Sequence, residues 1–372
     1  MWRPISSVRS MSVNWSMRNG MRSSITIWSV STTRPEARMR TDMIPRVEII
    51  ALGGTIACQP DAAGAGVAPS LTAADLVIAV PALAGRAVVG ARDLANLPST
   101  EIDLPLLFAL AILIRAFEQD GTEGVVVTQG TDTIEETAYV LDLLHNGRLP
   151  VVVTGAMRNP SLPGADGPAN LLAAVTCAVD PACRDLGVLV AFDDTIHAAR
   201  WVQKRDTTST GAFWSPAPLG WLAEGEVALY ARAKRRAGVS VPTDAAVPFV
   251  PILKPGISDE PRLIEAAMAA GAAGLVLDLA GGGHVHTDWL APLSDAAKRV
   301  PVVFASRTRG GRVLGGTYRQ PGGEIDLVSR GLTGSGDLDA LKARLLLMLL
   351  LMAGRPDEFA LRASLSLPAL TS

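Results

Sequence analysis

Two threonines stand in short glycine-containing segments that directly follow apolar runs. Thr55 comes after Gly53-Gly54 and the run Val47–Ala51, and Thr131 comes after a glycine and the run Gly124–Thr128. Glycines let the backbone turn sharply and approach a ligand closely, and backbone N–H groups in such a turn can hold an oxyanion or a carboxylate. A threonine hydroxyl placed there is a candidate nucleophile, although it needs a neighbouring base. The glycine pair alone is equally typical of a plain tight turn or a phosphate-binding turn.

Asp132 and Lys204 are the ionisable residues that could assist these hydroxyls. Asp132 adjoins Thr131, and Lys204 could act as a base for a threonine hydroxyl or a water molecule. Each residue also has a simpler interpretation. A lysine on a loop is usually a solvated charge, and Thr133 and Glu136 have the spacing of a helix capping box. Capping does not require Gly-Thr-Asp ahead of those two residues, so the catalytic interpretation stays open.

The elements that must position these residues are strands alternating with helices. Continuous Val/Ile runs separated by helical stretches indicate parallel strands buried on both faces. We therefore predict an α/β fold with an open, mostly parallel sheet, whose sites form beyond the carboxyl ends of the strands. In the N-terminal part of the chain, strands are expected at Val47–Ala51, Gly124–Thr128, Val151–Thr154 and Gly187–Phe192. Helices are expected there at Leu104–Glu118, Ile134–His145 and Pro168–Val179.

The same pattern divides the chain into segments. Residues 1–44 are rich in Ser, Arg and Met and are expected to be a disordered or leader segment. Residues 45–213 are predicted to be a larger N-terminal α/β catalytic domain, 214–248 a linker, and 249–372 a second α/β domain. Strands of the second domain are expected at Phe249–Leu253, Gly274–Leu279 and Pro301–Ala305.

Composition excludes several classes of protein. The net charge of −2 and the 5% aromatic content argue against a nucleic-acid-binding surface. Three cysteines do not make a disulfide framework, which favours a cytoplasmic protein with reduced thiols. The apolar runs Leu104–Ile114 and Leu345–Ala353 are shorter than the roughly 20 residues of a membrane-spanning helix. His284-Val285-His286 has no third ligand at a convincing spacing, so no metal site is expected.

Taken together, the motifs resemble those of the bacterial-type L-asparaginase/glutaminase family. The resemblance runs from Val47 to the C-terminus and is strongest before Thr208. It implies hydrolysis of the side-chain amide of asparagine, with some glutaminase activity in many members, and neither metal nor cofactor. The segments that carry it are Gly53–Ala57, Gly130–Ala138, Gly155–Arg158 and Ala165–Asn170.

The resemblance also implies roles for individual residues. The nucleophile corresponds to Thr55, and the second threonine with its aspartate and lysine corresponds to Thr131, Asp132 and Lys204. The serine that binds the substrate α-carboxylate corresponds to Ser99, followed here by Thr100 in place of the usual glutamine. Asp132 would also hold the substrate ammonium group. An acid borrowed from a neighbouring subunit corresponds to Glu324, which implies a homo-oligomer, a dimer or a tetramer.

Two departures from the family pattern keep other interpretations open. The tyrosine of the mobile loop is missing, and its place falls near Gly66. The asparagine that the second domain usually directs toward the site is missing at Lys254-Pro255-Gly256. The alternatives are an amino-acid sensor with little turnover, and the asparaginase-like subunit of a tRNA amidotransferase.

Overall fold

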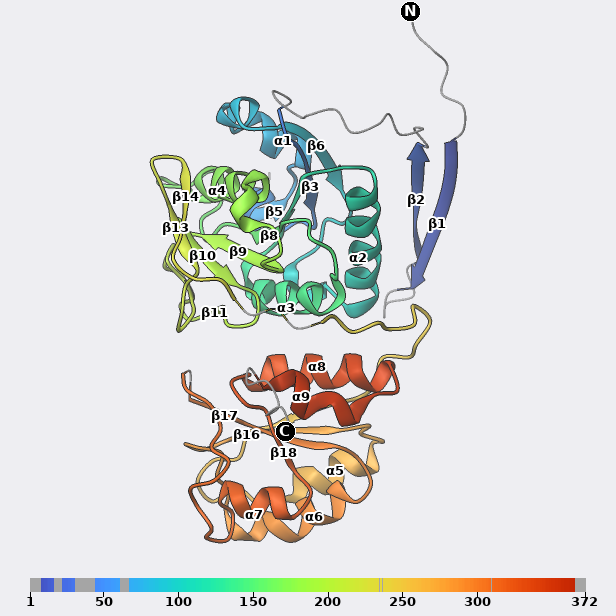
Figure 1. The fold of residues 1–372 in the computed structure, drawn as a ribbon, viewed down its shortest axis with the longest axis vertical. Helices are drawn as coiled ribbons and strands as arrows, with labels where there is room; N and C mark the ends of the chain where they lie inside the picture. The colour runs from blue at the N-terminus through green and yellow to red at the C-terminus, as the bar shows by residue number, and fades with distance from the viewer. Residues whose placement is uncertain are drawn as a thin grey trace, which may run out of the picture. The chain divides into compact units, whose positions relative to one another are not determined.

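The computed structural model describes residues 8–16, 22–30, 44–60, 67–233, 235, 237–308 and 310–364. The chain divides into two compact units, residues 1–235 and residues 236–372. Each unit is built around its own β-sheet, and Figure 1 shows the helices that accompany each sheet. The predicted α/β class is confirmed.

The sheet of the first unit is open and mostly parallel, as predicted. Its order is β14-β13-β10-β9-β8-β7-β3-β6. Five neighbouring strands are parallel: β6 (Val88–Asp93), β3 (Arg46–Ala51), β7 (Gly124–Thr128), β8 (Val151–Thr154) and β9 (Val188–Phe192). Three antiparallel strands complete it: β10 (Thr195–Ala198), β13 (Gly220–Ala223) and β14 (Glu226–Leu229).

Helices cover both faces of this sheet, which explains its continuous apolar strands. Alternate strand residues such as Ile49, Val126 and Val152 share a core with α1 (Ala73–Ile78) and α4 (Gly167–Val179). The residues between them are equally buried, because α3 (Ile134–Leu144) packs against β8 and β9, and α2 (Leu104–Gln119) packs against α3. Burial of both faces is the usual arrangement of a parallel sheet.

The first unit extends beyond the boundary expected from the sequence. We expected a linker from residue 214, but Phe213–Trp214 (β12) pairs with Gln203–Lys204 (β11), and β13 and β14 extend the main sheet. These strands are short and lie among prolines and charged residues, which obscures their period-2 pattern. Only the segment after residue 235 leaves the first unit.

The N-terminal segment also differs from the expectation of disorder. Residues Val8–Ser16 (β1) and Arg22–Val30 (β2) form an antiparallel pair in which Met11 lies opposite Ile27 and Val13 opposite Ile25. In the sequence these apolar residues alternate with polar ones, a pattern typical of strands. The composition of the segment concealed this alternation.

The predicted place of the missing tyrosine, Gly66, lies outside the described residues.

The second unit is a smaller parallel α/β structure. Its strands are β15 (Ile252–Leu253), β16 (Leu275–Leu279), β17 (Val302–Ser306) and β18 (Thr333–Gly334). Its helices are α5 (Arg262–Ala269), α6 (Leu290–Ala297), α7 (Glu324–Ser329), α8 (Ala340–Met352) and α9 (Phe359–Ala363). Three of its strands, β15, β16 and β17, share a core with α5 and α6.

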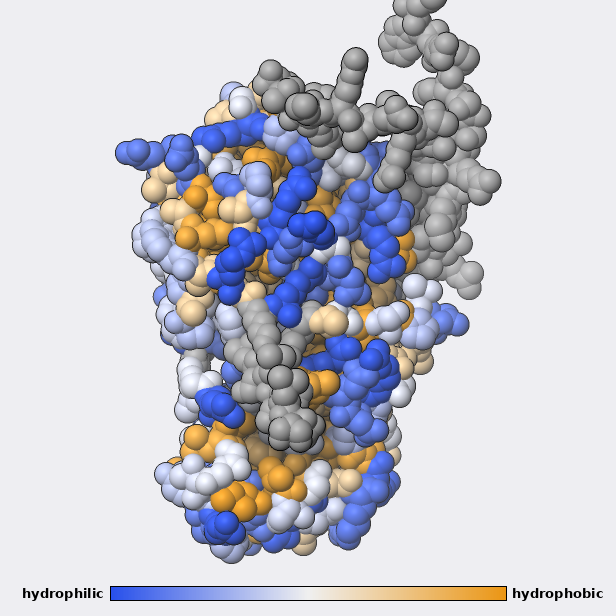
Figure 2. Space-filling view, viewed as in Figure 1, coloured by the Kyte–Doolittle hydropathy of each residue, from blue (hydrophilic) through white to orange (hydrophobic). Residues whose placement is uncertain are grey.

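Both apolar runs noted in the sequence are core helices. They lie in α2 and α8, and half of the residues of α2 and most of those of α8 are buried. Within the described ranges, no helix has both the length and the apolar character needed to span a bilayer. Hydrophilic and hydrophobic residues are interspersed on the face that Figure 2 presents.

Candidate active site

Three hydroxyl-bearing turns follow three neighbouring strands. Ser99 begins a 3-10 turn (Ser99–Glu101) after β6, Thr55 begins one (Thr55–Ala57) after β3, and Thr131 begins one (Thr131–Thr133) after β7. Strand β3 is parallel to both of its neighbours, β6 and β7. The carboxyl ends of parallel strands meet at one edge of a sheet, so the topology brings these turns together where α/β sites form.

The Thr55 and Thr131 turns touch through glycine backbone. Gly54 has φ 87° and ψ −176°, a conformation open essentially only to glycine. A Cβ atom on Gly54 would lie 2.0 Å from the backbone nitrogen of Gly130 and 2.3 Å from its Cα. A Cβ on Gly130 would in turn lie 3.0 Å from the Oγ of Ser99. Glycine at both positions therefore allows the three turns to pack directly against one another.

Lys204 is directed at the Thr131 turn. Its Nζ lies 2.8 Å from Thr131 Oγ1 and 2.6 Å from Asp132 Oδ1, and its side chain is only 16% exposed. The lysine is therefore not a solvated loop charge. Strand β11, which carries it, packs against α3. Because Nζ donates to Thr131 Oγ1, the threonine oxygen is the acceptor and its own proton is left to point elsewhere.

The hydroxyl of Thr55 is placed differently. Thr55 is partly exposed, and its hydroxyl has no hydrogen-bond partner in the part of the chain that the structure describes. Next to it, the Cys58 thiol lies 3.3 Å from the carbonyl oxygen of Gly54, and burial raises the pKa of that thiol. A thiol held in its neutral form is a poor nucleophile. Of these two side chains, Thr55 is therefore the better candidate nucleophile.

The charged and polar groups around these turns differ in exposure. Ser99 is buried, Thr100 beside it is exposed, and the carboxylate of Asp132 is 66% exposed. Asp132 can therefore meet a cation from solvent while it stays paired with Lys204. The hydroxyl of Ser99 is a hydrogen-bond donor that suits an anionic group.

Thr133 does not cap α3, in contrast to the capping interpretation. It is the N-cap residue of that helix, yet its side chain makes no capping hydrogen bond. Its Oγ1 donates instead to the backbone oxygen of Ser99 over 2.9 Å, and the Nε2 of Gln129 donates to Thr133 Oγ1 over 3.2 Å. The role of Gln129 is not among the expectations from the sequence. Its place directly before Gly130-Thr131 was the available signal.

The segments Gly155–Arg158 and Ala165–Asn170 support the segment that leads to Thr131. Asp166 accepts hydrogen bonds from the backbone N–H groups of Met157 and Arg158, and Asn170 Nδ2 donates to the carbonyl oxygen of Gly155. A Cβ on Gly155 would lie 2.5 Å from the backbone oxygen of Gln129. The backbone at Gly155 therefore packs closely against the segment that leads to Thr131.

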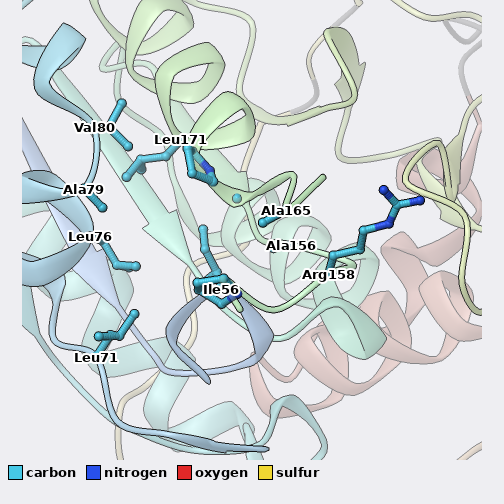
Figure 3. Close-up of a pocket in the computed structure, with 12 residues that line it drawn as sticks. Ile56, Leu71, Leu76, Ala79, Val80, Ala156, Arg158, Ala165 and Leu171 are labelled. Atoms are coloured by element: carbon cyan, nitrogen blue, oxygen red, sulfur yellow. The ribbon is translucent and has the colours of Figure 1, made fainter. Parts of the chain in front are cut away.

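An apolar cavity of about 60 Å³ lies beside Ile56, the residue after Thr55. Its other lining residues come from residues 71–80, which include α1, and from residues 156–171. Figure 3 shows the one charged lining residue, Arg158, extending away from the cavity. Because the described residues that line this cavity are apolar apart from Arg158, it does not suit a zwitterion.

Glu324 lies in the second unit, where it is fully buried. Its Oε1 accepts hydrogen bonds from the backbone N–H groups of Thr317 (2.6 Å) and Tyr318 (2.7 Å), and its Oε2 lies 3.3 Å from His284 Nε2. Burial acts to raise the pKa of Glu324, but hydrogen bonds from those N–H groups bring it below its ordinary value. The ring of His284 is partly exposed, at 30% of its side-chain surface, and Tyr318 beside it is exposed.

His286 pairs with Asp288 at the surface. Among the described residues, no three His, Cys, Asp or Glu side chains are grouped as metal ligands.

Comparison with family models covers both units. The model of the N-terminal domain of asparaginases matches residues 46–235, and the model of the glutaminase/asparaginase C-terminal domain matches residues 250–363. The chain belongs to the asparaginase family. The resemblance inferred from the threonine motifs is thereby confirmed. The first match ends at residue 235, where the structure also ends the first unit.

The chain is similar to individual asparaginases over most of its length. L-asparaginase 2 of Bacillus subtilis is 36% identical over 320 residues, which are 83% of this chain and 83% of the relative. L-asparaginase 2 of Escherichia coli is 35% identical over 83% of this chain and 89% of the relative. The crystal structure of a probable cytoplasmic L-asparaginase from Campylobacter jejuni has a TM-score of 0.78 and 32% identity, covering 86% of this chain and 99% of that one. The two-domain asparaginase architecture is therefore present here.

Proposed function

We propose that this chain hydrolyses L-asparagine to L-aspartate and ammonia through an acyl-enzyme on Thr55. Family membership and the L-asparaginases among its relatives support the reaction. The observation that carries the assignment of residues is the contact of two threonine turns through Gly54 and Gly130, with Lys204 bonded to Thr131. No cofactor is needed for this chemistry.

The proposed reaction has two steps. In acylation, Thr55 Oγ1 forms a bond to the side-chain carbonyl carbon of asparagine, and the amide nitrogen leaves as ammonia after it takes up the hydroxyl proton. In deacylation, water attacks the ester, its proton returns to Thr55, and aspartate is released. Backbone N–H groups of the glycine turns can stabilise the oxyanion of each tetrahedral intermediate. Thr131, which accepts from Lys204, carries protons between these groups.

The substrate is a zwitterion, so its two charges need opposite partners. We assign its ammonium group to the exposed carboxylate of Asp132 and its α-carboxylate to Ser99, with Thr100 beside it. Glutamine is longer by one methylene. Its hydrolysis at the same site is proposed as a secondary activity, since hydrophobic discrimination of one methylene is worth only about 1–3 kcal/mol.

We also propose a homo-oligomer, a dimer or tetramer, in which Glu324 serves the site of a neighbouring subunit. Because its carboxylate is buried, Glu324 would act through the partly exposed ring of His284, with which it forms a hydrogen bond. A solution mass equal to one fully active chain would refute this arrangement. A cytoplasmic location is proposed with it, supported by three buried free cysteines and by the Campylobacter relative, described as a probable cytoplasmic enzyme.

Replacement of Thr55 by valine tests the proposed nucleophile. Valine keeps the shape and removes the hydroxyl, so kcat for ammonia release should fall by at least about 10³-fold while the melting temperature is kept. Thr176→Val is a matched control, because that hydroxyl bonds back to Leu172 of its own helix. Near-normal activity of Thr55→Val would exclude the nucleophile assignment. A wild-type protein that binds asparagine without releasing ammonia would indicate an amino-acid sensor.

A further inference from the structure

We propose that Thr133 is a positioning residue that sets the recognition of the substrate α-carboxylate by holding the Ser99 turn against the Thr131 turn. The inference rests on the proposed role of Ser99. It starts from the hydrogen bond between Thr133 Oγ1 and the backbone oxygen of Ser99, which joins residues 34 positions apart over 2.9 Å.

The direction of this hydrogen bond is fixed by its neighbours. The carbonyl oxygen of Gly130 can only accept, so the nitrogen of the Gln129 amide must face it, at 3.2 Å. The same nitrogen donates to Thr133 Oγ1, also at 3.2 Å. Since the Thr133 oxygen accepts from Gln129, and a backbone oxygen can only accept, the Thr133 proton is directed to Ser99. The order of donation is therefore Gln129 to Thr133 to Ser99.

The Ser99 turn is a 3-10 turn of three residues without a side-chain cap. Within the Ser99 turn, the backbone N–H of Glu101 donates to Pro98 O over 3.0 Å and that of Ile102 donates to Ser99 O over 3.2 Å. The Thr133 bond is different because it ties this turn to the Thr131 turn. The side chain of Ser99 meets the backbone of Gly130, where an added Cβ would lie only 3.0 Å from Ser99 Oγ. Contact with Gly130 limits how near the turn can come, and the Thr133 bond limits how far it can move away. The two together fix the distance between the proposed carboxylate-binding hydroxyl and the threonines.

Gln129 is an unusual residue for a purely structural purpose. Its side chain is fully buried, and its Oε1 has no hydrogen-bond partner among the described residues. A buried polar atom without a partner costs stability. An apolar residue of similar size would avoid that cost. The amide therefore lowers stability at this position, and we attribute its presence to the hydrogen bonds that its nitrogen donates. That nitrogen orients Thr133.

The test compares L-asparagine with its decarboxylated analogue, β-alaninamide, in a set of variants. Thr133→Val should raise KM for asparagine about tenfold, the loss of about one hydrogen bond, with kcat changed less than about threefold. The kcat/KM for β-alaninamide should stay near the wild-type value, because that substrate has no α-carboxylate. Thr133→Ser, which keeps the hydroxyl, should restore recognition of asparagine.

Two further variants keep the test decisive. Thr137→Val is the matched control: Thr137 is a buried threonine of the same helix whose hydroxyl has no partner among the described residues, and its loss should change nothing. Gln129→Met removes the donor to Thr133 together with the unpartnered oxygen. It should fold and should raise KM for asparagine selectively, by less than Thr133→Val does.

The outcomes separate this inference from the proposed role of Ser99. Equal losses on both substrates in Thr133→Val, or a loss confined to kcat, would overturn the inference. So would a normal KM for asparagine in Thr133→Val while Ser99→Ala loses selectivity for the carboxylate. If Ser99→Ala also keeps that selectivity, the proposed binding role of Ser99 fails and the inference fails with it.

Discussion

Replacing Gly54 by alanine probes the contact that joins the two threonine turns. The backbone of Gly54 has φ 87° and ψ −176°, and a non-glycine residue held in such a region costs about 1–3 kcal/mol. The added Cβ would also stand 2.0 Å from the nitrogen of Gly130, where ordinary contacts begin at 3.4 Å. Both contacting atoms are backbone, so no side chain can rotate away to relieve the overlap.

The structure gives the size of the expected effect. Restoring an ordinary contact requires the two turns to separate by 3.4 − 2.0 = 1.4 Å. A misplacement of about 1 Å at a reacting centre can cost about 10²-fold in rate. We therefore expect kcat/KM of Gly54→Ala to fall by at least about 10²-fold. The backbone cost alone should lower the melting temperature by roughly 2–12 °C, given about 2–4 °C per kcal/mol in a domain of this size.

Gly121→Ala is the matched control for the backbone term. Gly121 also has a positive φ, 79°, but a Cβ there would meet nothing within 4 Å. This variant should lose some thermal stability and keep full activity. Ammonia release and thermal unfolding of both purified variants provide the comparison. If Gly54→Ala keeps wild-type kcat/KM and loses no more stability than Gly121→Ala, the two turns do not depend on this contact.

Two further predictions concern ionisable groups. Lys204→Met and Thr131→Val should each lower kcat by about 10²–10⁴-fold. The double variant should be little worse than either single variant, because Lys204 Nζ and Thr131 Oγ1 are hydrogen-bonded over 2.8 Å and act as a unit. Fully additive losses in steady-state kinetics would show that the two residues act independently. His197 is buried, its Nδ1 lies 2.8 Å from Ser215 Oγ, and burial lowers its pKa from 6.5 to about 4. Its contribution to the free energy of unfolding is therefore complete above pH 6.5 and is lost as the pH falls toward 4, by up to about 3 kcal/mol. Denaturant unfolding of wild type and His197→Gln at pH 7.5 and 4.5 measures this, and an equal acid loss in both proteins would contradict it.

The amino-acid sequence by itself determined the class of fold and the places of the Thr55 and Thr131 turns at the ends of strands. Val47–Ala51 and Gly124–Thr128 are continuous apolar runs followed by glycines, and a strand buried on both faces requires such a run. Parallel neighbours end at the same edge of a sheet, so the sequence pattern alone predicts that Thr55 and Thr131 lie at one site. These inferences succeeded because they depend on local patterns.

Sequence reasoning failed where a local pattern was weak or had two meanings. Thr133 and Glu136 match a capping box, and nothing local reveals that the Thr133 hydroxyl bonds to Ser99 instead. Strands β13 and β14 are short and irregular in composition. They extend the sheet because β13 pairs with the edge of β10 and β14 in turn pairs with β13. Pairing with an existing edge can outweigh a weak intrinsic strand preference.

Only the tertiary structure decided which distant groups meet. Lys204 is 73 positions from Thr131, and the pairing of β11 with β12 together with the packing of β11 on α3 sets its Nζ on the hydroxyl. Glu324 could be chosen from the sequence as an acid, but its burial beneath the N–H groups of Thr317 and Tyr318 could not be foreseen. Side-chain burial and long-range hydrogen bonds depend on how separate elements pack, and the local sequence does not encode that packing residue by residue.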